Sequence, residues 1–153
     1  FLHTEYRSVL GMINWLQSRT QFQSCYRFSR NASRQPSPTI GDCRNVNKLV
    51  RAIKAAPVAL HFWPLHGQLR LLGFPDASYK NNEDKSSQRA LTIFLAEDRS
   101  TKASTDASGS LIEYESHKIT RTTMSTTVAE LYALMKCFGT CLFLKGLWAD
   151  ISG

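Results

Sequence analysis

An extended apolar run that leads to an acid occupies residues 69–79, LRLLGFPDASY. Four of its first six residues are large and apolar, and turn-forming residues lie on both sides, which predicts a strand from Leu69 to Phe74. Asp76 follows two residues later, where the run becomes polar at Ser78. An aspartate in this place either forms a turn or presents a carboxylate at the end of a strand, and the residues alone leave both explanations open.

Further extended runs surround this one. Residues 58–63 are expected to form a hairpin with it through a turn at Pro64–Gly67. A third run covers Ala90–Ala96, and Ser110–Ser116 alternates in the way of a half-buried strand. The long polar stretch Glu97–Gly109 connects these two strands.

A helix is predicted to begin around Ser125–Thr127 and to continue to about Trp148. We expect one apolar side of this helix to pack inward, with Leu131, Leu134, Phe138, Cys141 and Leu142. Glu130 lies in the first turn and shares that side. A carboxylate that faces a core needs a partner. One explanation is a capping box with Thr127, and the other is a functional acid.

The first third of the chain is predicted to be helical. The spacing of three and four residues indicates apolar faces in three segments, formed by Tyr6, Val9, Leu10, Ile13 and Leu16, by Phe22, Cys25, Ser29 and Ala32, and by Cys43, Val46, Leu49, Val50 and Ile53. Ser37 and Pro38 are expected to be the N-cap and first residue of the third helix. Pro57 ends it. The sequence therefore predicts two regions, residues 1–57 and residues 58–153.

The composition is that of a globular protein, with 42% hydrophobic and 20% charged residues. No apolar run is expected to approach the roughly 20 residues that span a bilayer, and no secretory signal is recognised, so we expect no membrane. The formal charge of +7 favours a polyanion such as nucleic acid. Because Lys and Arg are spread along the chain, a merely solvated basic surface explains the charge equally well.

The four cysteines are expected to be free thiols. Cys25, Cys43, Cys137 and Cys141 include no C-x-x-C pair and no nearby histidine at the spacing of a zinc site. Cys137 and Cys141 are one helical turn apart, where core packing is commoner than metal binding. Free thiols favour an intracellular, reducing compartment.

Three motifs occur in the order of a known family: LRLLGFPDASY at residues 69–79, Ser86-Ser87-Gln88, and STTVAELYAL at residues 125–134. Together they resemble the ribonuclease H domain of copia-type retrotransposons. The segment Glu5–Gly11 resembles the end of the reverse transcriptase in such polyproteins. The basic helix through Lys48, Arg51 and Lys54 resembles the connection to the nuclease.

The resemblance implies an α/β (α+β) domain with an incomplete ribonuclease H-like fold, in which antiparallel strands carry one packing helix after a helical region. It maps Asp76 and Glu130 onto two of four catalytic acids. The family hydrolyses the RNA of RNA–DNA hybrids with two Mg²⁺ ions, so Asp76 would bridge both ions and Glu130 would hold one. Such a site would bind hard magnesium through carboxylate oxygens.

The later acids of the family have no counterpart before Gly153, and Asp150 falls where the family has the end of a helix. We therefore expect a fragment of a retroelement polyprotein that is inactive in isolation. The alternatives are a non-catalytic module that binds nucleic acid and a degenerate retroelement relic. An exposed sheet edge could also let such a fragment associate.

Overall fold

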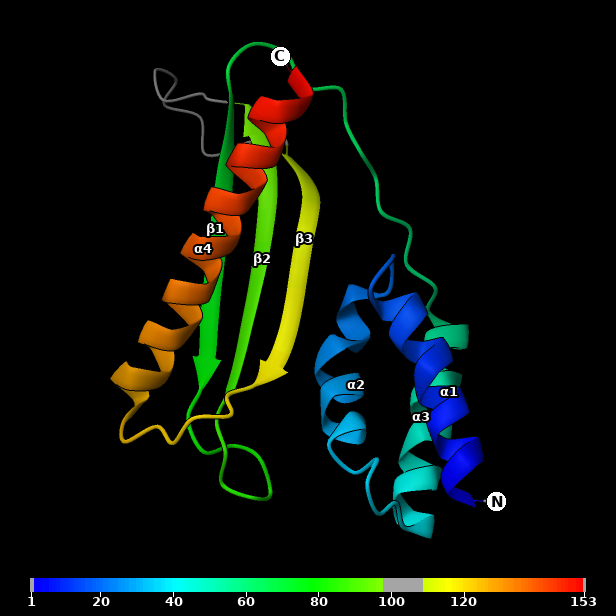
Figure 1. Cartoon of the computed structure of the whole chain (residues 1–153). Helices are drawn as coiled ribbons and strands as arrows, with labels where there is room; N and C mark the ends of the chain where they lie inside the picture. The colour runs from blue at the N-terminus through cyan, green and yellow to red at the C-terminus, as the bar shows by residue number, and fades with distance from the viewer. Residues whose placement is uncertain (1, 98–108, 153) are drawn as a thin grey trace. The chain divides into compact units, whose positions relative to one another are not determined.

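The computed structural model describes residues 2–97 and 109–152. Its elements, in chain order, are α1 (Leu2–Gln17), the short 3-10 helix η1 (Phe22–Ser24), α2 (Cys25–Ala32), α3 (Ile40–Ala55), β1 (Leu69–Ser78), β2 (Gln88–Glu97), β3 (Gly109–Lys118) and α4 (Thr126–Ser152) (Figure 1). This is the expected mixture of antiparallel strands and helices, an α+β chain. The polar connection expected between β2 and β3 lies almost wholly outside the described residues.

The chain divides into two compact units. The first, here called the helical unit, contains Phe1–Leu60 and Ser116–Lys118. The second, the sheet unit, contains His61–Glu115 and Ile119–Gly153. Each unit has a hydrophobic cluster of its own.

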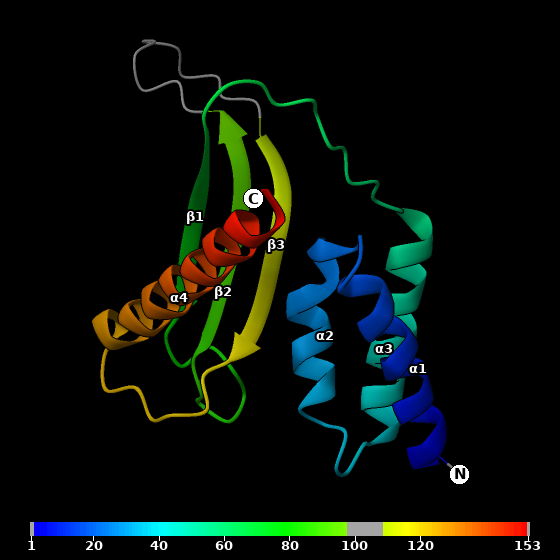
Figure 2. The same cartoon turned by 45° about the horizontal axis from the view of Figure 1, so that its top comes forward.

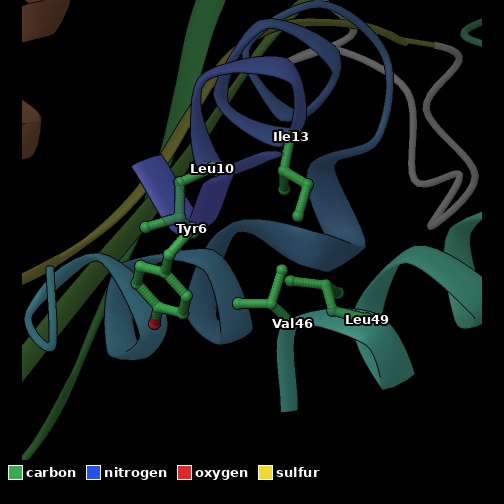
Figure 3. Close-up of a cluster of buried hydrophobic side chains, with 5 residues drawn as sticks. All are labelled: Tyr6, Leu10, Ile13, Val46 and Leu49. Carbon is green, nitrogen blue, oxygen red and sulfur yellow. The ribbon is translucent and has the colours of Figure 1, made fainter. Parts of the chain in front are cut away.

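The cluster of the helical unit lies between α1 and α3. Tyr6, Leu10 and Ile13 of α1 and Val46 and Leu49 of α3 are buried together, as Figure 3 shows. These residues belong to the apolar faces that the helical spacing predicts, so that prediction is confirmed. The Tyr6 hydroxyl donates a hydrogen bond of 2.8 Å to the backbone oxygen of Asn31, which ties α1 to α2.

The start of α3 differs from the prediction. The N-cap is Thr39, not Ser37, and Pro38 precedes the helix. The Thr39 hydroxyl accepts from the Asp42 amide at 3.2 Å, and an Asp42 carboxylate oxygen accepts from the Thr39 amide at 2.8 Å. This reciprocal capping box satisfies two amides at the helix start and selects Thr39. The end of the helix at Ala55, just before Pro57, is as predicted.

The expected hairpin before β1 is wrong. Residues 56–68, all of them described, contain no strand. Pro57 and Pro64 each lack an amide hydrogen for a sheet ladder, and Phe62 and Trp63 are exposed rather than packed. The apolar letters of residues 58–63 therefore form an irregular segment that leads to β1.

The sheet unit is a three-stranded sheet in the order β1-β2-β3. β1 and β2 pair antiparallel along their whole length, from Leu69 opposite Glu97 to Ser78 opposite Gln88. Pro75 lies within this ladder, opposite Leu91. A proline is tolerated there because β1 has a neighbour on one side only in the described sheet.

The helix α4 lies across one face of the sheet, over β1 and β2 (Figures 1 and 2). It starts where predicted but runs to Ser152, past the expected end at Trp148. By length and composition alone its residues Thr126–Ile151 could cross a membrane, which differs from the expectation that no apolar segment reaches that length. A single helix of this kind does not establish a membrane span, although only 17% of its most apolar 18-residue stretch is buried.

The side of α4 that faces the sheet agrees with the predicted one only at Cys141, which packs against the hydrophobic cluster of the sheet unit. Ala129, Ala133 and Cys137 are buried, whereas Leu134 and Phe138 are 54% and 62% exposed. Small side chains form the contact because α4 approaches the backbone of β1 closely. A Cβ atom added to Gly73 would lie 2.5 Å from the Cys137 Sγ.

Candidate functional site

Asp76 lies inside β1 and not beyond its end, since the strand runs on to Ser78 and Asp76 pairs with Ala90. The turn explanation for Asp76 is therefore wrong. Its side chain is exposed. The ladder shows no interruption in register between Gly73 and Asp76.

The face of the sheet that Asp76 occupies follows from Gly73. Gly73 faces α4, because an added Cβ would meet the Sγ atoms of Cys137 and Cys141. Successive side chains in a strand point to opposite faces. Asp76 therefore shares its face with Phe74, which is exposed and stacks edge-on against Phe94, and turns away from the face that α4 covers.

The first turn of α4 contains no acid, so the prediction that Glu130 lies in the first turn is wrong; Glu130 is the fifth residue of the helix and is exposed. The capping-box explanation for Glu130 is wrong, because the helix begins at Thr126 and the Ser125 hydroxyl accepts from the Val128 amide at 3.2 Å. Ser125 thus takes the N-cap position and Val128 the third helical position, which leaves Glu130 outside the cap. Neither capping nor core packing accounts for Glu130.

The two carboxylates do not form a magnesium site by themselves. Within residues 2–97 and 109–152, no three His, Cys, Asp or Glu side chains gather in a group that could hold a metal ion. Mg²⁺ requires near-octahedral oxygen coordination. Asp76 lies on the sheet face that α4 does not cover and Glu130 lies on α4, and these two exposed acids supply too few ligands. The residues present therefore do not fit the two-ion site of the resembled family. Asp150 is exposed near the end of α4 and adds nothing to it.

An ionic cluster that the sequence did not reveal joins three elements of the sheet unit. A Glu115 carboxylate oxygen on β3 lies 3.3 Å from the Arg89 Nη2 on β2. The other oxygen lies 3.9 Å from the Lys136 Nζ on α4. Because these pairs depend on strand register and on how α4 lies, no local pattern could predict them.

The four cysteines are free, as predicted. Burial raises the pKa of the Cys137 thiol above its usual value, and the neighbouring Cys141 raises it further. A thiol with a raised pKa stays protonated near neutral pH and is a poor nucleophile and metal ligand. Cys137 is therefore a packing residue between α4 and β1.

The net charge of the chain lies entirely in its first part. Residues 1–60 contain nine Lys and Arg but only two acids, a formal charge of +7, whereas residues 61–153 contain ten of each. Lys and Arg are spread along the chain as expected, but the acids that balance them are not. The net positive charge that the composition shows therefore belongs to residues 1–60 and not to the whole chain.

The solvent side of α3 carries a stripe of this charge. Arg44, Lys48 and Arg51 are all exposed, and their spacing of four and three residues places them on one side of the helix. Val46 and Leu49 are buried on the opposite side. We call Arg44, Lys48 and Arg51 the α3 basic stripe.

Comparison with known proteins adds no family assignment, since no family model, no curated protein and no solved structure matches the chain.

Proposed function

We propose that the sheet unit descends from a ribonuclease H-type nuclease of a copia-type retroelement polyprotein and that this chain alone does not cleave nucleic acid. The observation that carries the proposal is the order of elements around the two acids. A strand that bears Asp76 is followed by two further strands, and then by a helix with Glu130 just past its first turn. The resembled domain has the same order of strand, acid, helix and acid.

The absence of cleavage follows from the ligands that the described residues offer. Hydrolysis by two metal ions needs carboxylates that hold both ions on one side of the substrate. Asp76 and Glu130 are exposed and project from different faces, and no third acid joins them in residues 2–97 and 109–152. Ancestry and present activity are therefore separate questions for this chain.

Incubation of the full chain with a labelled RNA–DNA hybrid and Mg²⁺ should give no cleavage above the rate without protein. Asp76→Asn and Glu130→Gln should leave that background unchanged, because neither acid acts. Product on a denaturing gel is the measurement. Magnesium-dependent cleavage that either substitution abolishes would show that the chain is an active nuclease.

The ancestry has a test of its own that does not depend on activity. If the proposal is correct, the genomic reading frame beyond Gly153 encodes another strand with an aspartate. A frame that continues into an unrelated sequence without such a strand would contradict descent from this family.

A second candidate function is sequence-independent binding of nucleic acid by the helical unit. It is favoured by the formal charge of +7 in residues 1–60 and by the exposed α3 basic stripe. Each Lys or Arg near a phosphate releases condensed counterions, which strengthens binding at low salt. An acidic membrane is a poorer partner for this surface, because the apolar face of α3 is buried and does not offer side chains for insertion.

Substitution of the α3 basic stripe by glutamine, in the triple variant Arg44→Gln, Lys48→Gln and Arg51→Gln, should weaken binding to a duplex. The slope of log affinity against log salt should become shallower by roughly two to three, since each lost phosphate contact removes about 0.9. Fluorescence anisotropy across a salt series measures both quantities.

The matched control removes the same charge from the sheet unit, through Lys80→Gln, Lys85→Gln and Arg121→Gln, three exposed positions. This control should keep most of the salt slope. Equal losses in the two triple variants would mean that net charge, and not the α3 basic stripe, determines binding.

A further inference from the structure

The side of α4 that points away from the sheet is apolar and exposed. Leu131, Leu134, Met135, Phe138 and Leu142 are each between 52% and 62% exposed. Their spacing of three and four residues makes one continuous stripe along the helix, here called the α4 outer stripe. The opposite side of α4 is the one that Ala129, Ala133 and Cys137 bury against the sheet.

The α4 outer stripe has the size of an interaction surface. At roughly 100 Å² of exposed area for each side chain, its five residues present about 500 Å². Contiguous apolar patches of about 300–600 Å² are the largest that ordinary monomers expose and are often functional. A pair of such stripes would bury about 1,000 Å² in total, the size at which specific interfaces begin.

The charges beside the α4 outer stripe indicate what covers it. Lys145 lies seven residues after Phe138 and therefore on the line of the stripe, whereas Glu130 lies four residues before Leu134 and seven before Cys137, at the edge of the stripe nearest the sheet. Both are exposed, and neither makes an ion pair within the described residues. Each is thus available to a partner.

These charges are complementary to the same helix in the reverse direction. If a two-fold axis passes near Phe138, Glu130 lies eight residues to one side of it and Lys145 seven residues to the other. The difference of one residue is about 1.5 Å along the helix. The same axis pairs Leu134 with Leu142, four residues away on either side, and Phe138 with itself. Such self-complementarity is the property of an isologous interface.

We propose that the α4 outer stripe binds the α4 outer stripe of a second copy of this chain, with the two helices antiparallel and Glu130 of each copy beside Lys145 of the other. This inference does not depend on the proposed function. It also differs from association through a sheet edge, because β1 and its unpaired backbone are not used.

A lipid bilayer fits α4 less well than a second copy does. Ala129, Ala133 and Cys137 are buried against β1 and β2, and Lys136 lies 3.9 Å from Glu115 of β3. Insertion would have to remove the helix from these contacts. It would also bury Glu130 and Lys145 in lipid, where charges are costly.

The proposal predicts that the full chain is a dimer by sedimentation velocity at micromolar concentration. Phe138→Glu should raise the dissociation constant of the dimer by at least about 30-fold, as expected for a residue at the centre of an interface. Met12→Glu is the matched control, because Met12 is equally apolar and 59% exposed but lies in α1; it should leave the dimer intact.

If Phe138→Glu impairs folding, reversal of the charges of Glu130 and Lys145 provides a second test of the dimer. Glu130→Lys alone and Lys145→Glu alone should each weaken the dimer about three- to tenfold, and the double variant should restore it, because the pair is only exchanged. The proposal would be overturned if the wild-type chain is a monomer, or if it forms open-ended aggregates without a dimer. It would also be overturned by a dimer that neither Phe138→Glu nor the two charge variants affect, or by a monomer that sediments with lipid vesicles.

Discussion

Replacement of Ile93 by alanine is expected to lower the free energy of unfolding of the sheet unit by about 2–5 kcal/mol, the usual cost of removing a large aliphatic side chain from a core. Ile93 is fully buried, at 0% exposure, in the middle of β2. It lies opposite Gly73 and packs with Leu91 and Cys137 under α4. Leu71, Ile112, Cys141 and Leu144 pack against this cluster, and the extent to which they relax into the cavity decides where in this range the cost falls.

A loss of this size is a large part of the free energy of unfolding of a typical domain. Folded domains are typically stable by about 5–15 kcal/mol, and among the described residues the buried hydrophobic cluster of the sheet unit consists of Leu91, Ile93 and Cys137. The described α4 also exposes most of its large apolar side chains. Ile93→Ala should therefore bring the sheet unit close to unfolding at room temperature.

Urea denaturation in a Trp15→Phe background measures the effect, since Trp63 and Trp148 then report on the sheet unit alone. Trp15 is 62% exposed, so its replacement should be benign. The milder variant Ile93→Val is the control and should cost about 0.5–1.5 kcal/mol. If alanine costs no more than valine, Ile93 does not fill the core of this unit.

Local sequence signals predicted well those parts of the fold that local forces determine. The apolar faces of α1 and α3 were found because Tyr6, Leu10 and Ile13, and likewise Val46 and Leu49, recur at helical spacing. Strands β2 and β3 were found from apolar runs and alternation. The N-cap of α3 was missed because Ser37 and Thr39 are both good caps, and only the partner Asp42 distinguishes them.

The orientation of α4 could not be predicted from its own residues, because the helix is apolar on all sides. Bulky Leu134 and Phe138 seemed the natural core residues, but the sheet offers them no room at Gly73. The inward side therefore belongs to the small residues Ala129, Ala133 and Cys137. This choice depends on a strand distant in sequence, and a local pattern carries no information about it.

In the candidate site too, local sequence predicted some features, whereas others depend on contacts between distant parts of the chain. The sequence placed Glu130 in the correct helix but Asp76 two residues beyond the end of its strand, because the length of β1 depends on its pairing with β2. The position of the net charge, by contrast, could have been found from the sequence alone. Counting acids as well as bases along the chain would have placed the net positive charge in residues 1–60.

The close approach of α4 to β1 makes Gly73→Ala the second substitution with a large expected effect. Glycine inside a strand costs about 0.5–1 kcal/mol relative to alanine, so local propensity alone predicts that this substitution stabilises the protein. The structure predicts the opposite sign. The new Cβ would lie 2.5 Å from the Cys137 Sγ and 3.2 Å from the Cys141 Sγ, and overpacking of this kind typically costs about 1–3 kcal/mol.

A double-mutant cycle with Cys137→Ala separates the contact from a general effect of the substitution. Without the Cys137 sulfur the added methyl group has space, so Gly73→Ala in that background should cost much less, with a coupling energy of about 0.5–3 kcal/mol. Gly139→Ala in α4 is the matched control, because a Cβ there meets nothing within 4 Å, and it should stabilise the helix by about 0.5–1 kcal/mol. If Gly73→Ala is as harmless as Gly139→Ala, the small side chains do not determine how α4 lies on the sheet, and the argument that turns the α4 outer stripe toward solvent loses its basis.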